Sequence, residues 1–190
     1  VGVAYKSDSS KTIYNEGLAT KCRSIGPYLN PNSEVVVDSR SSPLSALTEM
    51  EFGSMPNDAG GLLMDASEYL LLREHEPRLA AFVLPFVGSR DSIHGQRRFC
   101  VWINDDQVQE ALSIPSIASR VAHVKRHRES SDRETTKRLA EYPHAFGERR
   151  HKSVRSILIA RHSAEDRPYL PFDIVGPDTV IADSAIALPN

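Results

Sequence analysis

A dense group of hydrogen-bonding side chains follows a short apolar run late in the chain. The run SILIA, at residues 156–160, predicts a buried strand, and the next seven residues are RHSAEDR. An arginine can donate two hydrogen bonds to the O6 and N7 atoms of guanine, and a carboxylate can accept one from the cytosine amine. A second predicted strand, at 169–175, would anchor the other end of the loop and fix its geometry. The loop therefore has the residue types needed to distinguish base pairs in the major groove of DNA.

The same loop has a plainer interpretation. Arginines and carboxylates that lie close together on a solvated loop also pair with one another, and such surface ion pairs contribute little to stability. From the loop alone both interpretations stay open.

The charge distribution favours contact with a polyanion. Residues 120–155 contain eleven Lys or Arg and five Asp or Glu, a net charge of +6, whereas the remainder has 12 basic and 20 acidic side chains and carries -8. Phosphates are held mainly by Lys and Arg, so this basic block indicates a face that meets nucleic acid. Two alternatives remain, a solvated helix surface and a protein-protein interaction module that docks onto an acidic partner.

The usual catalytic motifs are absent from the sequence. It contains no GxxxxGK[ST], GxSxG, HExxH or CxxC motif. His123 and His127 are four residues apart and would share a helix face, but the Lys and Arg residues around them would repel a metal ion. A hydrolase that pairs His162 with Asp166 stays an alternative, which requires a nucleophile and an oriented base within hydrogen-bond reach. We expect no catalytic residue and no metal site in this chain.

Length and composition predict one soluble domain. The chain has 190 residues, of which 40% are hydrophobic and 25% charged, as is ordinary for a globular protein. The sequence shows neither a signal peptide nor an apolar run of about 18 residues that could cross a membrane. Cys100 lies in the apolar run RFCVWI, far from Cys22, and predicts a buried free thiol, which fits a cytoplasmic location. Because the chain begins and ends abruptly on predicted strands, we expect residues 1–190 to be a single domain excised from a longer polypeptide.

Periodicity and turn residues predict a mixed α+β fold, with mainly antiparallel sheet elements and a central helical segment. Strands are predicted at 1–5 and 11–14, as a hairpin, and at 35–37, 98–103, 154–160, 169–175, 179–183 and 185–188. Helices are predicted from Asp65, as N-cap, to near Pro77, at 78–84 and 108–112, after Pro115, and at 132–142. After Pro115, Ile117, Val121 and Val124 fall three or four residues apart on one apolar stripe, and Gly95 suits a tight turn before the strand at 98–103. An irregular loop at 38–57 is predicted to be packed by Leu44, Leu47, Met50, Phe52 and Met55.

Five phrases of the sequence together resemble a known family. They are IGPYL, VVVDSRSSPLSALTEMEFGSMPNDAGGLL, PFVGSRDSIHGQRRFCVWI, RVAHVKRHRESSDRETTKRLAEYPHAFGE and RPYLPFDIVGPDTVIADSAIALPN. In this order they resemble the target recognition domain of MmeI-like restriction-modification proteins, of type IIL or IIG, and of related adenine-specific DNA methyltransferases. The resemblance covers nearly the whole chain.

The resemblance implies a division of labour within a longer polypeptide. In this family one chain joins a nuclease, a helical connector, an AdoMet-dependent methyltransferase that modifies the exocyclic amine of adenine, and the recognition domain. The family's AdoMet-binding glycine motif and Asn-Pro-Pro-Tyr motif are absent here, as expected if they precede Val1. The resemblance implies double-stranded DNA and the upstream methyltransferase domain as partners. AdoMet would be a cofactor of the parent protein only.

Site residues follow from the resemblance and from the basic block. The resemblance implies that side chains around 159–167 choose the bases, with the candidates Arg161, Ser163, Glu165 and Arg167. The basic block supplies candidate phosphate contacts, which fix register without reading sequence. These are Lys125, Arg126, Arg128, Arg133, Lys137, Arg149, Arg150 and Lys152.

Overall fold

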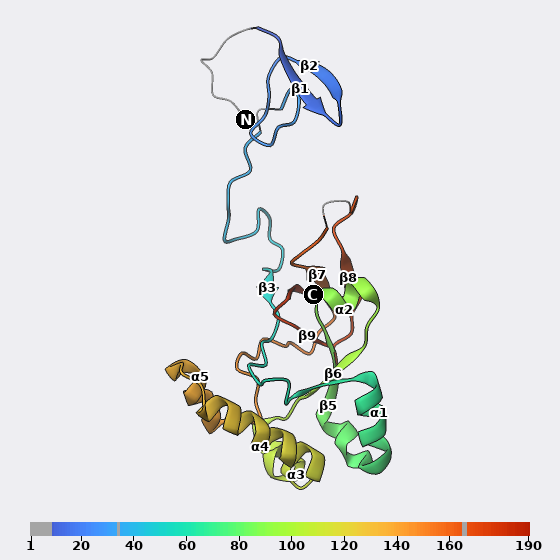
Figure 1. The fold of residues 1–190 in the computed structure, drawn as a ribbon, viewed down its shortest axis with the longest axis vertical. Coiled ribbons are helices and arrows are strands. Elements are labelled where there is room, and N and C mark those ends of the chain that lie inside the picture. Colours follow the sequence, from blue (N-terminus) through green and yellow to red (C-terminus); the bar gives the residue numbers. More distant parts are fainter. Residues whose placement is uncertain (1–8, 34, 165–166) are drawn as a thin grey trace. The chain divides into compact units, whose positions relative to one another are not determined.

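The structure divides into two compact units. It is a computed structural model that describes residues 9–33, 35–164 and 167–190 (Figure 1). Unit 1 is Val1–Pro43 and unit 2 is Leu44–Asn190. All the helices that the described residues form belong to unit 2.

Unit 1 contains a β-hairpin. Strand β1 (Lys11–Asn15) pairs antiparallel with β2 (Leu18–Cys22). The two linking residues, Glu16 and Gly17, have positive φ angles of 48° and 81°, as in two-residue turns whose twist matches that of the paired strands. The strand predicted here is confirmed, whereas its predicted partner, residues 1–5, lies outside the described residues.

The strand predicted at residues 35–37 is wrong. The three valines are exposed and form no strand. The Tyr28 hydroxyl accepts a hydrogen bond from Val37 N at 2.8 Å and donates to its carbonyl. β-branched residues favour strands where a sheet surface packs against them, and these valines have no such surface.

Unit 2 contains two four-stranded sheets. The first has the order β3-β10-β7-β8, with β3 (Glu51–Phe52), β10 (Ala185–Pro189), β7 (Ser156–Ala160) and β8 (Phe172–Val175). The second has the order β4-β6-β5-β9, with β4 (Leu63–Asp65), β6 (Arg98–Val101), β5 (Val83–Val87) and β9 (Val180–Ile181). Of the seven pairings between described strands, only that of β5 with β9 is parallel, which confirms the predicted mainly antiparallel α+β class.

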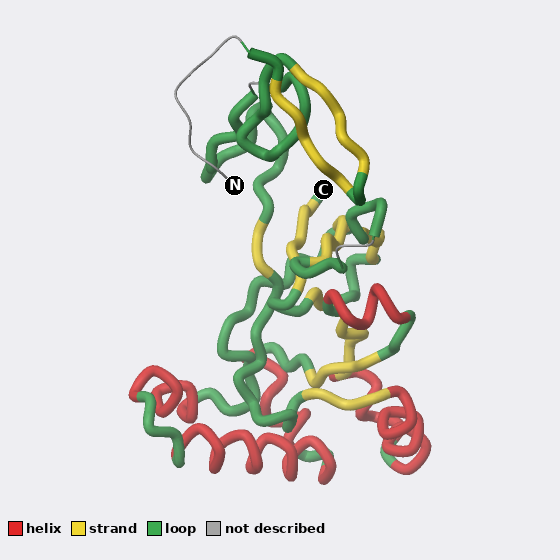
Figure 2. Tube along the Cα trace, turned by 45° about the horizontal axis from the view of Figure 1, so that its top comes forward, coloured by secondary structure: helices red, strands yellow, loops and turns green. Residues whose placement is uncertain are grey.

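The helices lie between residues 66 and 141, so the predicted central helical segment is confirmed (Figure 2). They are α1 (Ala66–His75), α2 (Ser89–His94), α3 (Val108–Leu112), α4 (Pro115–Glu129) and α5 (Glu134–Arg138), with short 3₁₀ turns at Pro77–Phe82, Asp105–Gln107 and Leu139–Glu141. The helix predicted at 78–84 is partly wrong, because Val83 and Leu84 pair with β6 as part of β5. Helix α2 was not predicted; it ends at Gly95, whose φ of 64° fits the turn predicted there.

Two apolar cores hold unit 2 together. The larger core lies between the second sheet and helices α3 and α4, and includes the predicted α4 stripe of Ile117, Val121 and Val124. The smaller core consists of Leu158, Val175 and Ala185 of the first sheet together with Ile181 of β9. The candidate base-reading connection, between β7 and β8, is therefore mounted on the smaller core.

Cys100 is fully buried in the larger core and is a free thiol, as predicted. Burial raises the pKa of this thiol to about 12. The thiol therefore stays protonated and unreactive at neutral pH.

The packing predicted for the loop at 38–57 is wrong for most of its apolar residues. Leu44, Leu47, Met50 and Phe52 are exposed. The segment is irregular as predicted, except that Glu51 and Phe52 form β3. Phe52 thereby reaches the edge of the first sheet.

Asp65 caps α1, as predicted, and this cap should be measurable. Its carboxylate accepts hydrogen bonds from Glu68 N at 2.8 Å and from Ser67 Oγ, and these bonds lower the pKa of Asp65 below 3.8. We expect Asp65→Ala to lower the free energy of urea unfolding at neutral pH. A carboxyl with a lowered folded-state pKa stabilises above its unfolded value of 3.8, and this stabilisation is lost as pH falls through the folded value. Asp65→Asn, a neutral cap, should lack that pH dependence; an equal dependence in both proteins would contradict the assignment.

Candidate functional site

Arg161, the first residue after β7, is held by three other parts of unit 2. Its backbone N donates to Ser89 Oγ at 3.0 Å. Its Nη1 donates to the carbonyl of Asp183 at 2.8 Å, and its guanidinium carbon lies 4.6 Å from the centre of the Phe52 ring. An exposed arginine with this many fixed contacts is oriented before any ligand arrives.

The segment that carries Ser89 is itself fixed. Asp91 is buried, accepts from Gly88 N at 2.7 Å and accepts from Arg98 Nε at 2.8 Å, which ties α2 to β6. A Cβ atom at Gly88 would lie 2.4 Å from Ser184 Oγ. A side chain at Gly88 would therefore push α2 away from the turn that leads into β10. Close packing here keeps Ser89 within reach of Arg161.

The outward face of the first sheet is apolar. Residues directly opposite one another in antiparallel strands share a face, and the register places seven apolar side chains there: Phe52, Ile157, Ile159, Phe172, Ile174, Ile186 and Leu188. Phe52 is 51% exposed and Phe172 66% exposed. Arg161 lies against this face through Phe52.

The other predicted base-reading residues fall partly within the described chain. Ser163 and Arg167 are exposed, and Arg167 N donates to the Ala164 carbonyl at 3.1 Å. Glu165 lies outside the described residues. Asp166 does as well, so the alternative pair of His162 with Asp166 stays a prediction.

The phosphate contact predicted for Arg128 is wrong. Its side chain is fully buried, so it does not meet a phosphate. The five N–H groups of its guanidinium donate to backbone carbonyls at 2.8–3.0 Å, those of Pro56, Asn57, Leu139, Tyr142 and Ala145. Burial lowers the pKa of Arg128, and the nearby charge of Asp58 opposes this shift. Arg128 therefore joins the end of α4 to two loops.

The remaining predicted phosphate contacts on α4 and α5 are solvent-exposed. Lys125 pairs with Glu129 at 3.9 Å, and Lys137 pairs with Glu134 at 3.6 Å. Arg126 and Arg133 form no ion pair with another described residue.

Three predicted phosphate contacts lie on the segment that leads into β7. Arg149 Nη1 lies 3.6 Å from Asp105, and its guanidinium carbon lies 4.6 Å from the centre of the Trp102 ring. Arg150 pairs with Glu148, and Lys152 Nζ lies 2.5 Å from Glu51 in β3. Arg150 and Lys152 are thus close to the first sheet.

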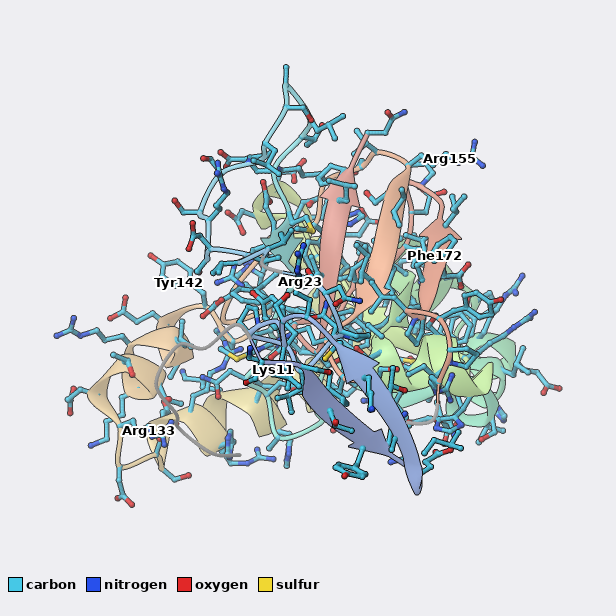
Figure 3. The ribbon with its side chains drawn as sticks, turned by 90° about the horizontal axis from the view of Figure 1, so that it is seen from above. Lys11, Arg23, Arg133, Tyr142, Arg155 and Phe172 are labelled. Atoms are coloured by element: carbon cyan, nitrogen blue, oxygen red, sulfur yellow. The ribbon has the colours of Figure 1, made fainter. Side chains whose placement is uncertain are left out.

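The structure separates two groups of residues that the sequence predicted to act together. Helices α4 and α5 lie at one end of unit 2, and the β7–β8 connection lies at the other (Figures 1 and 2). Seen from above, Arg133 lies on the helical segment, whereas Phe172 lies at the edge of the first sheet (Figure 3). The cations of α4 and α5 are therefore not next to the candidate base-reading residues.

Sequence reasoning missed the residues that surround Arg161. Phe52 was assigned to loop packing. Nothing in the sequence singled out Ser89 or Asp183 as a partner of Arg161. Arg90 and Arg97, two exposed cations on either side of Gly95, were not singled out either.

Neither a metal cluster nor a membrane span is found in the part of the chain that the structure describes. No three His, Cys, Asp or Glu side chains there are grouped so that they could hold a metal ion. None of the helices there has the length and apolar character needed to cross a bilayer.

Comparison with known proteins identifies the family. Residues 31–190 match the family described as "MmeI, target recognition domain". The chain is 36% identical over 174 residues to DNA methyltransferase A of Bacillus subtilis (strain 168), a match that covers 92% of this chain and 20% of that protein. A solved structure of the Type IIL restriction-modification enzyme MmeI in complex with DNA is 27% identical, with a TM-score of 0.80, and the match covers 97% of this chain and 26% of that one. The chain thus spans about a fifth to a quarter of these relatives, and it belongs to the MmeI target recognition domain family.

Proposed function

We propose that this chain is the sequence-specific DNA recognition domain of an AdoMet-dependent adenine DNA methyltransferase of the MmeI-like restriction-modification type. The family match, the relative that is a DNA methyltransferase and the similar structure solved with DNA support this proposal. The fragment would choose the target sequence and transfer no methyl group. Residues 1–190 would form one recognition domain of a longer cytoplasmic polypeptide.

The fixed position of Arg161 is the structural observation that most directly supports the proposal. A guanidinium has five N–H donors, and the described residues engage only one of them, through the Asp183 carbonyl. The remaining donors can meet the two acceptors of a guanine edge. A base-reading group needs a locked orientation, which Phe52 and Ser89 supply here. Ser163, Glu165 and Arg167 would read neighbouring positions from the same connection.

The phosphate contacts are proposed in two groups. Arg149, Arg150 and Lys152 lie on the segment before β7 and would exchange their exposed carboxylate partners for phosphates, because surface ion pairs contribute only about 0–1 kcal/mol. The exposed cations of α4 and α5 would contact DNA only where the duplex also reaches the other end of unit 2. These are Lys125, Arg126, Arg133 and Lys137.

The cofactor and the catalytic partner belong to the rest of the polypeptide in this proposal. The chain spans 20% of the relative that is a DNA methyltransferase, which leaves room for an upstream methyltransferase domain that binds AdoMet. Calorimetry should detect AdoMet binding by the complete polypeptide and none by this fragment. Binding by the fragment would contradict the division of labour.

The direct test is selection from a pool of random-sequence DNA duplexes. The chain should retain a subset with a shared sequence, and log K should fall linearly with log salt concentration. Recovery of an unbiased pool would contradict sequence-specific recognition. The main rival is an interaction module for an acidic protein, and binding to such a partner that persists above roughly 0.5 M salt, without DNA binding, would favour it.

A further inference from the structure

Two exposed arginines lie on the segment that anchors Arg161 through Ser89. Arg90 is in α2, and Arg97 follows Gly95, which ends that helix. Neither forms an ion pair with another described residue. Their charges are therefore uncompensated by a direct carboxylate contact in the described chain.

Both arginines lie on residues 88–98, a segment held by contacts on two sides. We call this segment the α2 platform. Asp91 and Arg98 close it onto β6, with Arg98 also 5.0 Å from the centre of the Phe86 ring. Its other side packs against the turn at 182–184. The backbone that carries the two cations is therefore held in a fixed position.

The α2 platform adjoins the candidate base-reading connection. Ser89 Oγ accepts from Arg161 N at 3.0 Å, and Arg90 is the next residue along the chain from Ser89. Helix α2 also contacts β7, as can be followed in Figure 1. A duplex whose base edge meets Arg161 thus has its backbone close to the α2 platform.

None of the predicted phosphate contacts lies on the α2 platform. Arg150 approaches Arg161 from the segment before β7, with its guanidinium carbon 6.0 Å from the centre of the Phe52 ring. Arg128 is buried, and α4 and α5 lie at the far end of unit 2 (Figure 1). A base-reading loop needs nearby phosphate contacts, because these fix the register of the protein on the duplex.

We propose that Arg90 and Arg97 form a phosphate-binding site that holds the DNA backbone beside the base pair read by Arg161. The site rests on the proposed function, since it serves the same duplex. It binds phosphate oxygens through charge, without regard to sequence.

The test compares two double variants of the full chain on the same duplexes. Arg90→Ala with Arg97→Ala removes the site, and Arg73→Ala with Arg138→Ala removes two exposed cations without an ion pair to another described residue, from α1 and α5, as the matched control. Affinity is measured by titration with the selected duplex and with a scrambled duplex, over a range of salt concentrations. Thermal unfolding of each variant checks that the fold is intact.

The α2 variant should bind both duplexes on the order of 10- to 100-fold more weakly at 0.1 M salt, with the salt slope reduced by about 2, because each lost phosphate contact removes roughly 0.9 from that slope. The control should bind nearly as the unchanged chain does. Arg90→Lys with Arg97→Lys should restore most of the affinity, since phosphate binding needs the charge.

Three results would overturn the site while leaving the proposed function intact. These are an α2 variant that binds as the unchanged chain does, equal losses in both double variants, and a loss confined to the selected duplex. The last would assign the two arginines to base reading. An unchanged chain that binds no duplex would instead refute the proposed function.

Discussion

Replacing Arg128 with methionine is expected to lower the free energy of unfolding of this chain by about 3–5 kcal/mol. Methionine fills part of the space but leaves five backbone carbonyls without their donors. A buried polar group without a partner costs roughly 1–3 kcal/mol, and partial relaxation of the loops limits the sum. Urea unfolding followed by circular dichroism measures the change.

Arg126→Met is the control for this loss. Arg126 lies two residues earlier on α4 and is exposed, so the change should stay within about 0.5 kcal/mol. A similar small change at Arg128 would contradict its role as a structural clamp. Arg128→Lys should also be destabilising, because an ammonium has three donors and cannot reach five carbonyls.

The second large effect is expected on DNA preference. Arg161→Ala should reduce discrimination between the selected duplex and its single-base variants by about 1–3 kcal/mol at one base position, which is roughly 5- to 150-fold. Arg161→Lys should lose most of that discrimination too, since it keeps the charge but not the paired donors. Competition titration with a panel of single-base variants identifies the position that Arg161 reads.

Arg155→Ala is the matched control. Arg155 is an exposed arginine that precedes β7, whereas Arg161 follows it, and its loss should weaken all duplexes alike or not at all. Phe52→Ala should blunt discrimination at the same position as Arg161→Ala, because it removes the ring against which the guanidinium rests. Unaltered discrimination in the Arg161 variants would remove Arg161 from base reading.

The parts of the fold that local chemistry dictates were predicted from the sequence. The Asp65 cap, the apolar stripe of α4 and the buried Cys100 each depend on residues close in the chain or on an apolar run. The three valines at 35–37 were misread, because their β preference needs a sheet neighbour that local sequence does not specify. The same holds for the end of the helix predicted at 78–84, where pairing with β6 prevailed.

The candidate site was only partly predictable for a related reason. The chemistry of Arg161 is visible in its own segment, but Ser89 lies 72 residues away in the sequence and Phe52 is on a different strand. Arg128 looked like its neighbours in the basic block, and only the tertiary fold shows that its five donors are turned inward. Charge counting alone cannot separate a clamp from a phosphate ligand.

The presence of two apolar cores has a consequence for engineering this chain. The β7–β8 connection is carried by four small-core residues, while most of the buried apolar side chains belong to the larger core around Cys100. Substitutions in the connection therefore leave the packing of the larger core unchanged, and this core supplies most of the apolar burial. If the connection reads bases as proposed, a designed library could vary it in search of new target sequences without first acquiring compensating stabilising changes.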